Sequence, residues 1–98
     1  GSGPIYTYLL IESMIDTGIH MGLSREKSKI LVNQTILGSI KYIIETDEHP
    51  TILRNDITSP GGTTAEALCI LEKERFRYTI SQAIWAAYKR SLELKKQV

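Results

Sequence analysis

Apolar residues recur at helical spacing through the first part of the chain, with no proline between Ile5 and Met21. They cover more than one face of a helix, so a single core-facing stripe does not account for them. Polar positions form one stripe with a spacing of four: Glu12, Asp16 and His20. Pro4 suits the first position of a helix, because its missing N–H would have no intrahelical partner there. The pattern predicts a first helix that begins at Pro4 and ends near Met21.

A second long helix is expected from Arg25 to about Thr46. Ser24 is a suitable N-cap, since its side chain can accept a bond from the first turn. The later part of this segment is apolar on several sides. Gly38 lies in its middle, where glycine costs up to about 1 kcal/mol relative to alanine. We therefore expect another backbone to approach Gly38 closely.

Prolines and glycines divide the rest of the chain. Pro50 can open a short helix through Arg54, and the residues from Thr58 to Thr64 form a clear loop. Two further helices are expected, from about Thr64 to Lys73 and from about Arg77 to Lys95. Strand-like alternation and internal repeats are not evident. The fold class is therefore all-α, a helical bundle of about four to five helices.

The two long N-terminal helices have more apolar surface than a small helical monomer needs. One interpretation makes them the central pair of a monomeric bundle. The other buries them in an intertwined dimer, in which the interface resembles a domain core cut in half. We favour the dimer, because a monomer of this size should show more polar outer faces. Cys69 is expected to be a small packed residue, and Trp85 and Tyr88 are expected to pack in the core or in the interface.

Length and composition narrow the possible functions. With 98 residues the chain has enough material for one domain, and too little for a complete two-domain enzyme. Its 42% hydrophobic content excludes a disordered tail, and no apolar run reaches the roughly 20 residues needed to span a bilayer. The net charge is only +1, which argues against nucleic-acid binding. The start, residues 1–4, does not look native, and we interpret it as a cut from a longer chain or a cloning remnant.

Metal and disulfide chemistry are not indicated. His20 and His49 have no second ligand at a metal-binding spacing, so no metal site is expected. The single cysteine, Cys69, cannot form an internal disulfide, which suggests a reducing compartment.

The most informative segment is the loop Ser59-Pro60-Gly61-Gly62-Thr63-Thr64. Thr63 and Glu66 have the spacing of a capping box, which would place a helix N-terminus directly after two glycines. Free N–H groups and the positive end of the helix dipole favour an anion there. The hydroxyl of Thr64 would lie beside that anion. The pattern predicts a pocket for a small carboxylate or phosphate, although an ordinary capped turn without a ligand accounts for it equally well.

The run from Asp56 to Ala65 resembles the signature of the pyrroline-5-carboxylate reductase family. Further matches cover essentially all 98 residues: residues 1–4 with Tyr6, Gly22-Leu23, residues 34–38, His49-Pro50 and residues 86–94. The match is to the C-terminal, all-helical dimerisation and substrate-binding domain of the family, over residues 1–98. The family's N-terminal nucleotide-binding domain has no counterpart in this chain. The family often has an acid at the position of Asn55 and glycine within residues 73–75.

The resemblance implies reduction of the C=N bond of pyrroline-5-carboxylate to L-proline with NADPH or NADH. It implies that the substrate is bound by the following residues: Glu48, Ser59, Gly61, Gly62, Thr63 and Thr64. Of these, Thr64 is the catalytic residue, with its hydroxyl on the ring nitrogen, and Glu48 orders the loop. The nicotinamide end of the cofactor would face a second set: Ser2, Gly3, Pro4, Asp56 and Ile57.

The resemblance also implies a homodimer, with a decamer as a further assembly, and no membrane or nucleic-acid partner. The domain alone is expected to be inactive. We expect a cytoplasmic location, with the mitochondrion as the alternative. The competing hypothesis is a stand-alone, non-catalytic helical dimerisation module that kept the loop without the chemistry.

Overall fold

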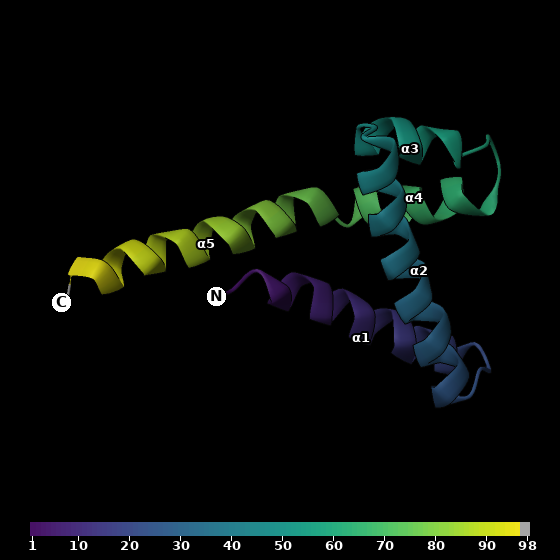
Figure 1. The fold of residues 1–98 in the computed structure, drawn as a ribbon, viewed down its shortest axis with the longest axis horizontal. Coiled ribbons are helices and arrows are strands. Elements are labelled where there is room, and N and C mark those ends of the chain that lie inside the picture. Colours follow the sequence, from purple (N-terminus) through teal and green to yellow (C-terminus); the bar gives the residue numbers. More distant parts are fainter. Residues whose placement is uncertain (97–98) are drawn as a thin grey trace. The chain divides into compact units, whose positions relative to one another are not determined.

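The computed structural model describes residues 1–96, and five helices follow one another along them (Figure 1). Their bounds are Pro4–His20 for α1, Arg25–Thr46 for α2, Pro50–Asp56 for α3, Thr63–Lys73 for α4 and Phe76–Lys96 for α5. No strand occurs in this part of the chain, so the predicted all-α class is confirmed. The predicted helix ends agree with the observed ones to within one or two residues.

Local chemistry explains these ends. Pro4 occupies the first turn of α1, where its missing N–H costs nothing. The predicted cap of α2 is confirmed: the side chain of Ser24 accepts a hydrogen bond from the Lys27 N–H at 3.1 Å. Asp47 ends α2 in a left-handed conformation, with φ at 54°, and its N–H donates to the Ile43 carbonyl. Aspartate tolerates this conformation better than most residues do.

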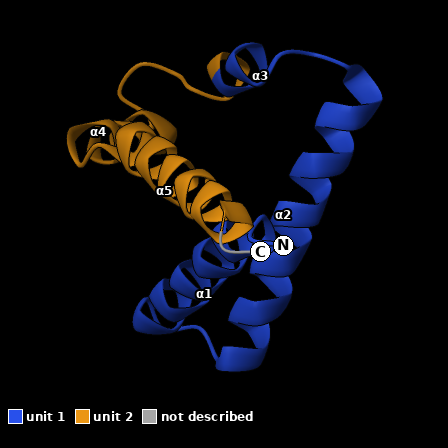
Figure 2. Cartoon of the chain, turned by 90° about the vertical axis from the view of Figure 1, so that its left-hand side faces the viewer, with its two compact units in different colours: residues 1–54 blue, residues 55–98 orange. Residues whose placement is uncertain are grey.

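The chain divides into two compact units, residues 1–54 and residues 55–98 (Figure 2). In the first unit α1 and α2 pack against each other around Ser28, whose side chain is fully buried. The Ser28 hydroxyl donates a 2.8 Å hydrogen bond to the Ile15 carbonyl of α1. Gly18 faces the same hydroxyl, and its missing side chain allows the two helices to approach this closely.

In the second unit a tight corner joins α4 to α5. Arg75 makes the turn in the left-handed region, with φ at 62°, and its guanidinium lies 4.0 Å from the centre of the Tyr78 ring. An ion pair between Glu72 and Arg77, 2.7 Å long and largely exposed, connects the two helices across the corner. Glycine would adopt this left-handed conformation more readily than arginine does.

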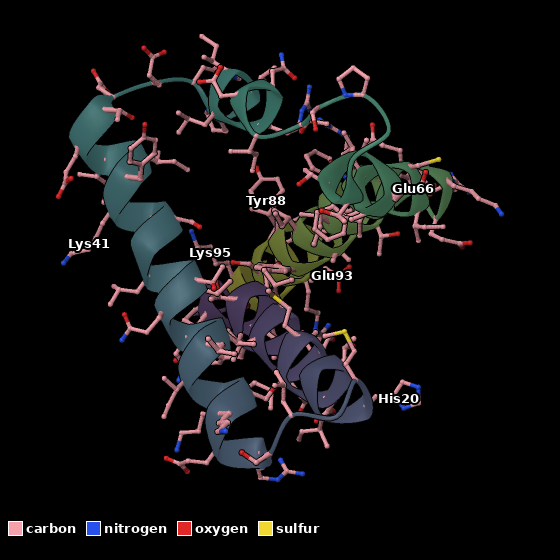
Figure 3. All side chains as sticks on the ribbon, turned by 90° about the vertical axis from the view of Figure 1, so that its right-hand side faces the viewer. His20, Lys41, Glu66, Tyr88, Glu93 and Lys95 are labelled. Atoms are coloured by element: carbon pink, nitrogen blue, oxygen red, sulfur yellow. The ribbon has the colours of Figure 1, made fainter. Side chains whose placement is uncertain are left out.

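Very little apolar surface is buried within the described part of the chain. Val32 is its one buried hydrophobic residue, whereas large apolar side chains are exposed on all five helices. Cys69, expected to be packed, is exposed, so that prediction is wrong. Trp85 and Tyr88 have ring centres 5.4 Å apart and are 58% and 52% exposed, so they do not lie in a core of this chain, and their place in an interface stays a prediction. Side chains stand away from the ribbon along the long helices, as Lys41 does on α2 (Figure 3).

Gly38 is similarly uncovered. A side chain at this position would meet nothing within 4 Å, so the expected close backbone neighbour is not found in the described part of the chain. No helix within residues 1–96 has the length and apolar character that crossing a membrane requires.

Candidate functional site

The loop before α4 is built on a tight turn from Ser59 to Gly62. Pro60 takes the second position of the turn and Gly61 the third, where φ is +72°. The turn is closed by a hydrogen bond from the Gly62 N–H to the Ser59 carbonyl at 3.1 Å. This is the pattern of a type II turn, which needs a residue with positive φ in third place. The sequence Pro-Gly therefore fixes the local backbone in front of the helix.

The capping box predicted for Thr63 and Glu66 is wrong. Gly62 is the N-cap of α4, with φ at −83° and ψ at 175°, and Thr63 is already the first helical residue. The first helical hydrogen bond runs from the Glu66 N–H to the Gly62 carbonyl at 3.2 Å. No side chain caps the helix, and Glu66 lies exposed in its first turn (Figure 3). The turn and Gly62 place the helix start one residue earlier than a threonine cap requires.

Without a side-chain cap, backbone N–H groups at the N-terminus of α4 are free to donate hydrogen bonds. The backbone N–H groups of Thr63, Thr64 and Ala65 have no hydrogen-bond acceptor among the described residues. Unsatisfied N–H groups at a helix start carry a partial positive charge and favour an anion. The predicted anion pocket therefore has a better structural basis than a capped helix would give it.

Three hydroxyl groups lie in the same stretch of chain. Ser59 and Thr63 are exposed and Thr64 is half-buried. None of the three hydroxyls forms a hydrogen bond within the described residues. Each is therefore available to donate to, or accept from, a small polar ligand.

The other predicted site residues are divided between the units. Asp56 ends α3 and Ile57 follows it, so both lie just before the loop in the second unit. Both are exposed, Ile57 to 71%. Glu48 is in the α2–α3 connection, and residues 2–4 form the start of α1, so these belong to the first unit. The second unit therefore brings together the loop residues and the end of α3.

Sequence reasoning missed the cap position of Gly62 and the part played by Thr58. The N–H of Thr58 donates to the Asn55 carbonyl at 3.2 Å, which closes the chain at the end of α3. The doubled glycine was the available signal for an uncapped helix start. It does not by itself reveal which of the following residues opens the helix.

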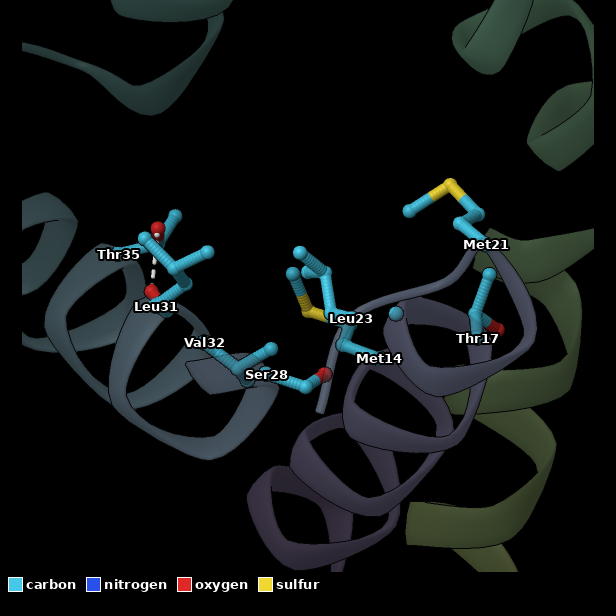
Figure 4. Close-up of a pocket in the computed structure, with 9 residues that line it drawn as sticks. Met14, Thr17, Met21, Leu23, Ser28, Leu31, Val32 and Thr35 are labelled. Atoms are coloured by element: carbon cyan, nitrogen blue, oxygen red, sulfur yellow. Dashed lines mark hydrogen bonds between the residues drawn. The ribbon is translucent and has the colours of Figure 1, made fainter. Parts of the chain in front are cut away.

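An apolar groove of about 310 Å³ lies between α1 and α2 in the first unit (Figure 4). Its walls come from both helices and their connection, with Met14, Leu23, Leu31 and Val32 among the lining residues. Three hydroxyl residues also line it, and none of its described lining residues is ionisable. Groups of three or more His, Cys, Asp or Glu side chains placed to hold a metal ion are not found within residues 1–96.

Nearly the whole chain is similar in sequence to known proteins. A family model described as pyrroline-5-carboxylate reductase dimerisation matches residues 1–94. Pyrroline-5-carboxylate reductase 1 of Bacillus subtilis is 48% identical over 98 residues, which are 100% of this chain and 33% of that protein. The pyrroline-5-carboxylate reductase of Synechocystis is 47% identical over 97 residues, 99% of this chain and 36% of that protein.

Among solved structures, the pyrroline carboxylate reductase of Plasmodium falciparum with NADP bound superimposes with a TM-score of 0.90. It is 50% identical and is matched over 93% of this chain and 35% of its own. The chain thus spans about a third of the length of the proteins it matches. The family model over residues 1–94 and the similarity to solved structures point to the same family. The chain belongs to the pyrroline-5-carboxylate reductase dimerisation family.

Proposed function

We propose that this chain, over residues 1–98, is the dimerisation and substrate-binding domain of an enzyme that reduces pyrroline-5-carboxylate to L-proline with NADPH or NADH. A nucleotide-binding domain outside the chain would supply most of the cofactor site. The observation that carries the proposal is the uncapped N-terminus of α4, because the substrate has the carboxylate that such a helix end favours. The names of the relatives support the same reaction.

The substrate carboxylate would take the place of the missing helix cap. The N–H groups of Thr63, Thr64 and Ala65 can donate to its oxygens, and the hydroxyls of Ser59 and Thr63 can add further bonds. Gly61 and Gly62 leave the approach to these donors open. Glu48 would order the loop from the α2–α3 connection.

Thr64 would act on the C=N bond in the ring of pyrroline-5-carboxylate. Reduction of the imine adds a hydride to carbon and a proton to nitrogen. With the carboxylate held at the helix end, the half-buried Thr64 hydroxyl is suited to donate a hydrogen bond to the ring nitrogen. It could then pass on a proton taken from solvent, as a positioned group does in general acid catalysis.

The cofactor's part is to supply the hydride. The exposed apolar side chain of Ile57, next to the loop, fits contact with the face of a nicotinamide ring. We assign Asp56 to the same end of the cofactor, together with Ser2, Gly3 and Pro4 at the start of α1. These residues orient the ring, and the hydride chemistry belongs to the cofactor itself.

We also propose that the domain works as a homodimer, which a decamer could extend. Its support is the apolar surface left open on all five helices, which is more than a soluble monomer ordinarily exposes. Light scattering of the purified chain at micromolar concentration should give the mass of a dimer. A monomer mass would contradict the interlocking interpretation. For the enzyme we infer a cytoplasmic location, supported by bacterial relatives and by the single cysteine.

The reaction is tested by following NADPH oxidation with pyrroline-5-carboxylate and the full-length protein. Thr64→Val keeps the shape of the side chain and removes the hydroxyl, so turnover should fall at least about tenfold. Thr51→Val, at an exposed position in the first turn of α3, is the matched control and should leave turnover unchanged. Unchanged turnover in Thr64→Val would remove Thr64 from the mechanism, and no activity in the wild type would overturn the proposed reaction.

A further inference from the structure

Gly62 is a glycine at a position whose backbone does not require one. Its φ of −83° and ψ of 175° are extended values that alanine adopts without strain. This sets it apart from Gly61, whose φ of +72° is costly for other residues. A reason for glycine at position 62 must therefore be sought in the space around its α-carbon.

That space is taken by Ser59. A β-carbon at position 62 would lie 2.7 Å from the Ser59 hydroxyl oxygen and 3.3 Å from the Ser59 carbonyl oxygen. The Ser59 β-carbon would be 3.9 Å away, which is an ordinary contact. The hydroxyl would have to move away from a side chain at position 62, and the carbonyl contact is tight enough that the turn would have to shift by a few tenths of an ångström. Gly62 therefore makes room for the Ser59 hydroxyl beside the start of α4.

The Ser59 hydroxyl is placed there without a partner among residues 1–96. It forms no hydrogen bond with any described residue, and it lies against the N-cap of a helix whose first N–H groups are also unbonded. The turn holds the two residues together through the Gly62 N–H and the Ser59 carbonyl. A hydroxyl held in this way is ready to bond to the anion that the helix end attracts.

We propose that Gly62 is a positioning residue for substrate binding, whose missing side chain keeps the Ser59 hydroxyl at the α4 N-terminus where the substrate carboxylate binds. The inference rests on the proposed function of this loop. Any side chain at position 62 would make the Ser59 hydroxyl rotate away from the α4 N-terminus. The Thr64 hydroxyl does not contact Gly62 in this structure and would stay in place.

Steady-state kinetics of the full-length enzyme test the proposal with three variants. Gly62→Ala should raise KM for pyrroline-5-carboxylate about tenfold, the scale expected for losing one hydrogen bond to a charged group. Its kcat should stay within about twofold of wild type, because Thr64 is undisturbed. Its melting temperature should fall only slightly, because an exposed serine can rotate at little cost and the Ser59 carbonyl needs to shift by only a few tenths of an ångström. Ser59→Ala should give the same rise in KM.

The double variant Ser59→Ala/Gly62→Ala separates positioning from simple blockage by the new methyl group. If Gly62 acts through Ser59, the double variant has the same KM as either single variant. If the methyl group itself obstructs the carboxylate, the two effects multiply to about a hundredfold rise, and the proposal is overturned. A wild-type KM in Gly62→Ala also overturns it.

A crystal structure of the full-length Gly62→Ala protein gives a readout that does not depend on activity. The Ser59 hydroxyl is expected to have moved to another rotamer while the turn shifts by only a few tenths of an ångström and α4 stays in place. A hydroxyl found in its original position would refute the positioning role even in an enzyme that proved inactive towards pyrroline-5-carboxylate. Failure of this inference is thereby distinguished from failure of the proposed reaction.

Discussion

Replacing Gly18 with alanine should disrupt the contact between α1 and α2. Gly18 faces Ser28, the one side chain that is fully buried in the described part of the chain. A β-carbon at position 18 would collide with the Ser28 hydroxyl and would lie 3.2 Å from the Ser28 β-carbon and 3.5 Å from a Leu23 methyl group. The hydroxyl would have to leave its 2.8 Å hydrogen bond to the Ile15 carbonyl.

The cost follows from three terms. Overpacking a tight contact costs about 1–3 kcal/mol. A buried hydroxyl that loses its hydrogen bond costs about another 1–3 kcal/mol. Alanine returns about 1 kcal/mol through its better helix propensity. The free energy of unfolding should therefore fall by about 1–5 kcal/mol.

Urea denaturation at a fixed protein concentration measures this change, because dimer stability depends on concentration. Ser28→Ala removes the hydroxyl without adding bulk and should cost only about 1 kcal/mol. In the double variant Gly18→Ala/Ser28→Ala the main clash is gone, so it should be more stable than Gly18→Ala alone. Gly18→Ala protein as stable as the wild type would refute the reasoning about this contact.

Three further changes test other parts of the structure. Arg75→Gly should be about 1 kcal/mol more stable than Arg75→Ala in urea denaturation. Both variants lose the contact with Tyr78, and only alanine keeps the strain of the left-handed conformation. Equal stabilities would contradict this. Gly38→Ala should weaken the dimer at least about tenfold in sedimentation equilibrium, as a glycine reserved for a second copy's backbone would. Unchanged affinity would place Gly38 outside the interface. Ser24→Ala should cost about 1 kcal/mol by loss of the α2 cap, and an unchanged urea midpoint would refute that role.

The helices could be predicted because their ends depend on neighbouring residues. Pro4 opens α1, Ser24 caps α2 and Pro50 opens α3, and each acts within one turn of its own position. The start of α4 lies one residue earlier than the sequence predicts, because it depends on the turn before it and not on a capping side chain. The type II turn carries the chain into the helix at Thr63, and neither threonine next to the glycines indicates this alone.

Burial could not be predicted for individual side chains. Cys69, Trp85 and Tyr88 are residue types that are usually packed against other side chains, yet they are exposed in this chain. Burial depends on what covers a face, and helical spacing indicates only that a face is apolar. The same spacing correctly indicated an excess of apolar surface. The sequence predicts an anion site at the loop, and this stays a prediction; which N–H donors are open there depends on which residue is the helix cap.

The most direct test of the central claim compares pyrroline-5-carboxylate with its uncharged carboxamide as substrates of the full-length enzyme. The two differ only in the group that the α4 N-terminus is proposed to hold. Hydrogen bonds to a charged group contribute about 1.5–3 kcal/mol. The account therefore predicts a kcat/KM at least about tenfold lower for the carboxamide. Equal kcat/KM values for the two would contradict the claim that the open end of α4 binds the substrate carboxylate.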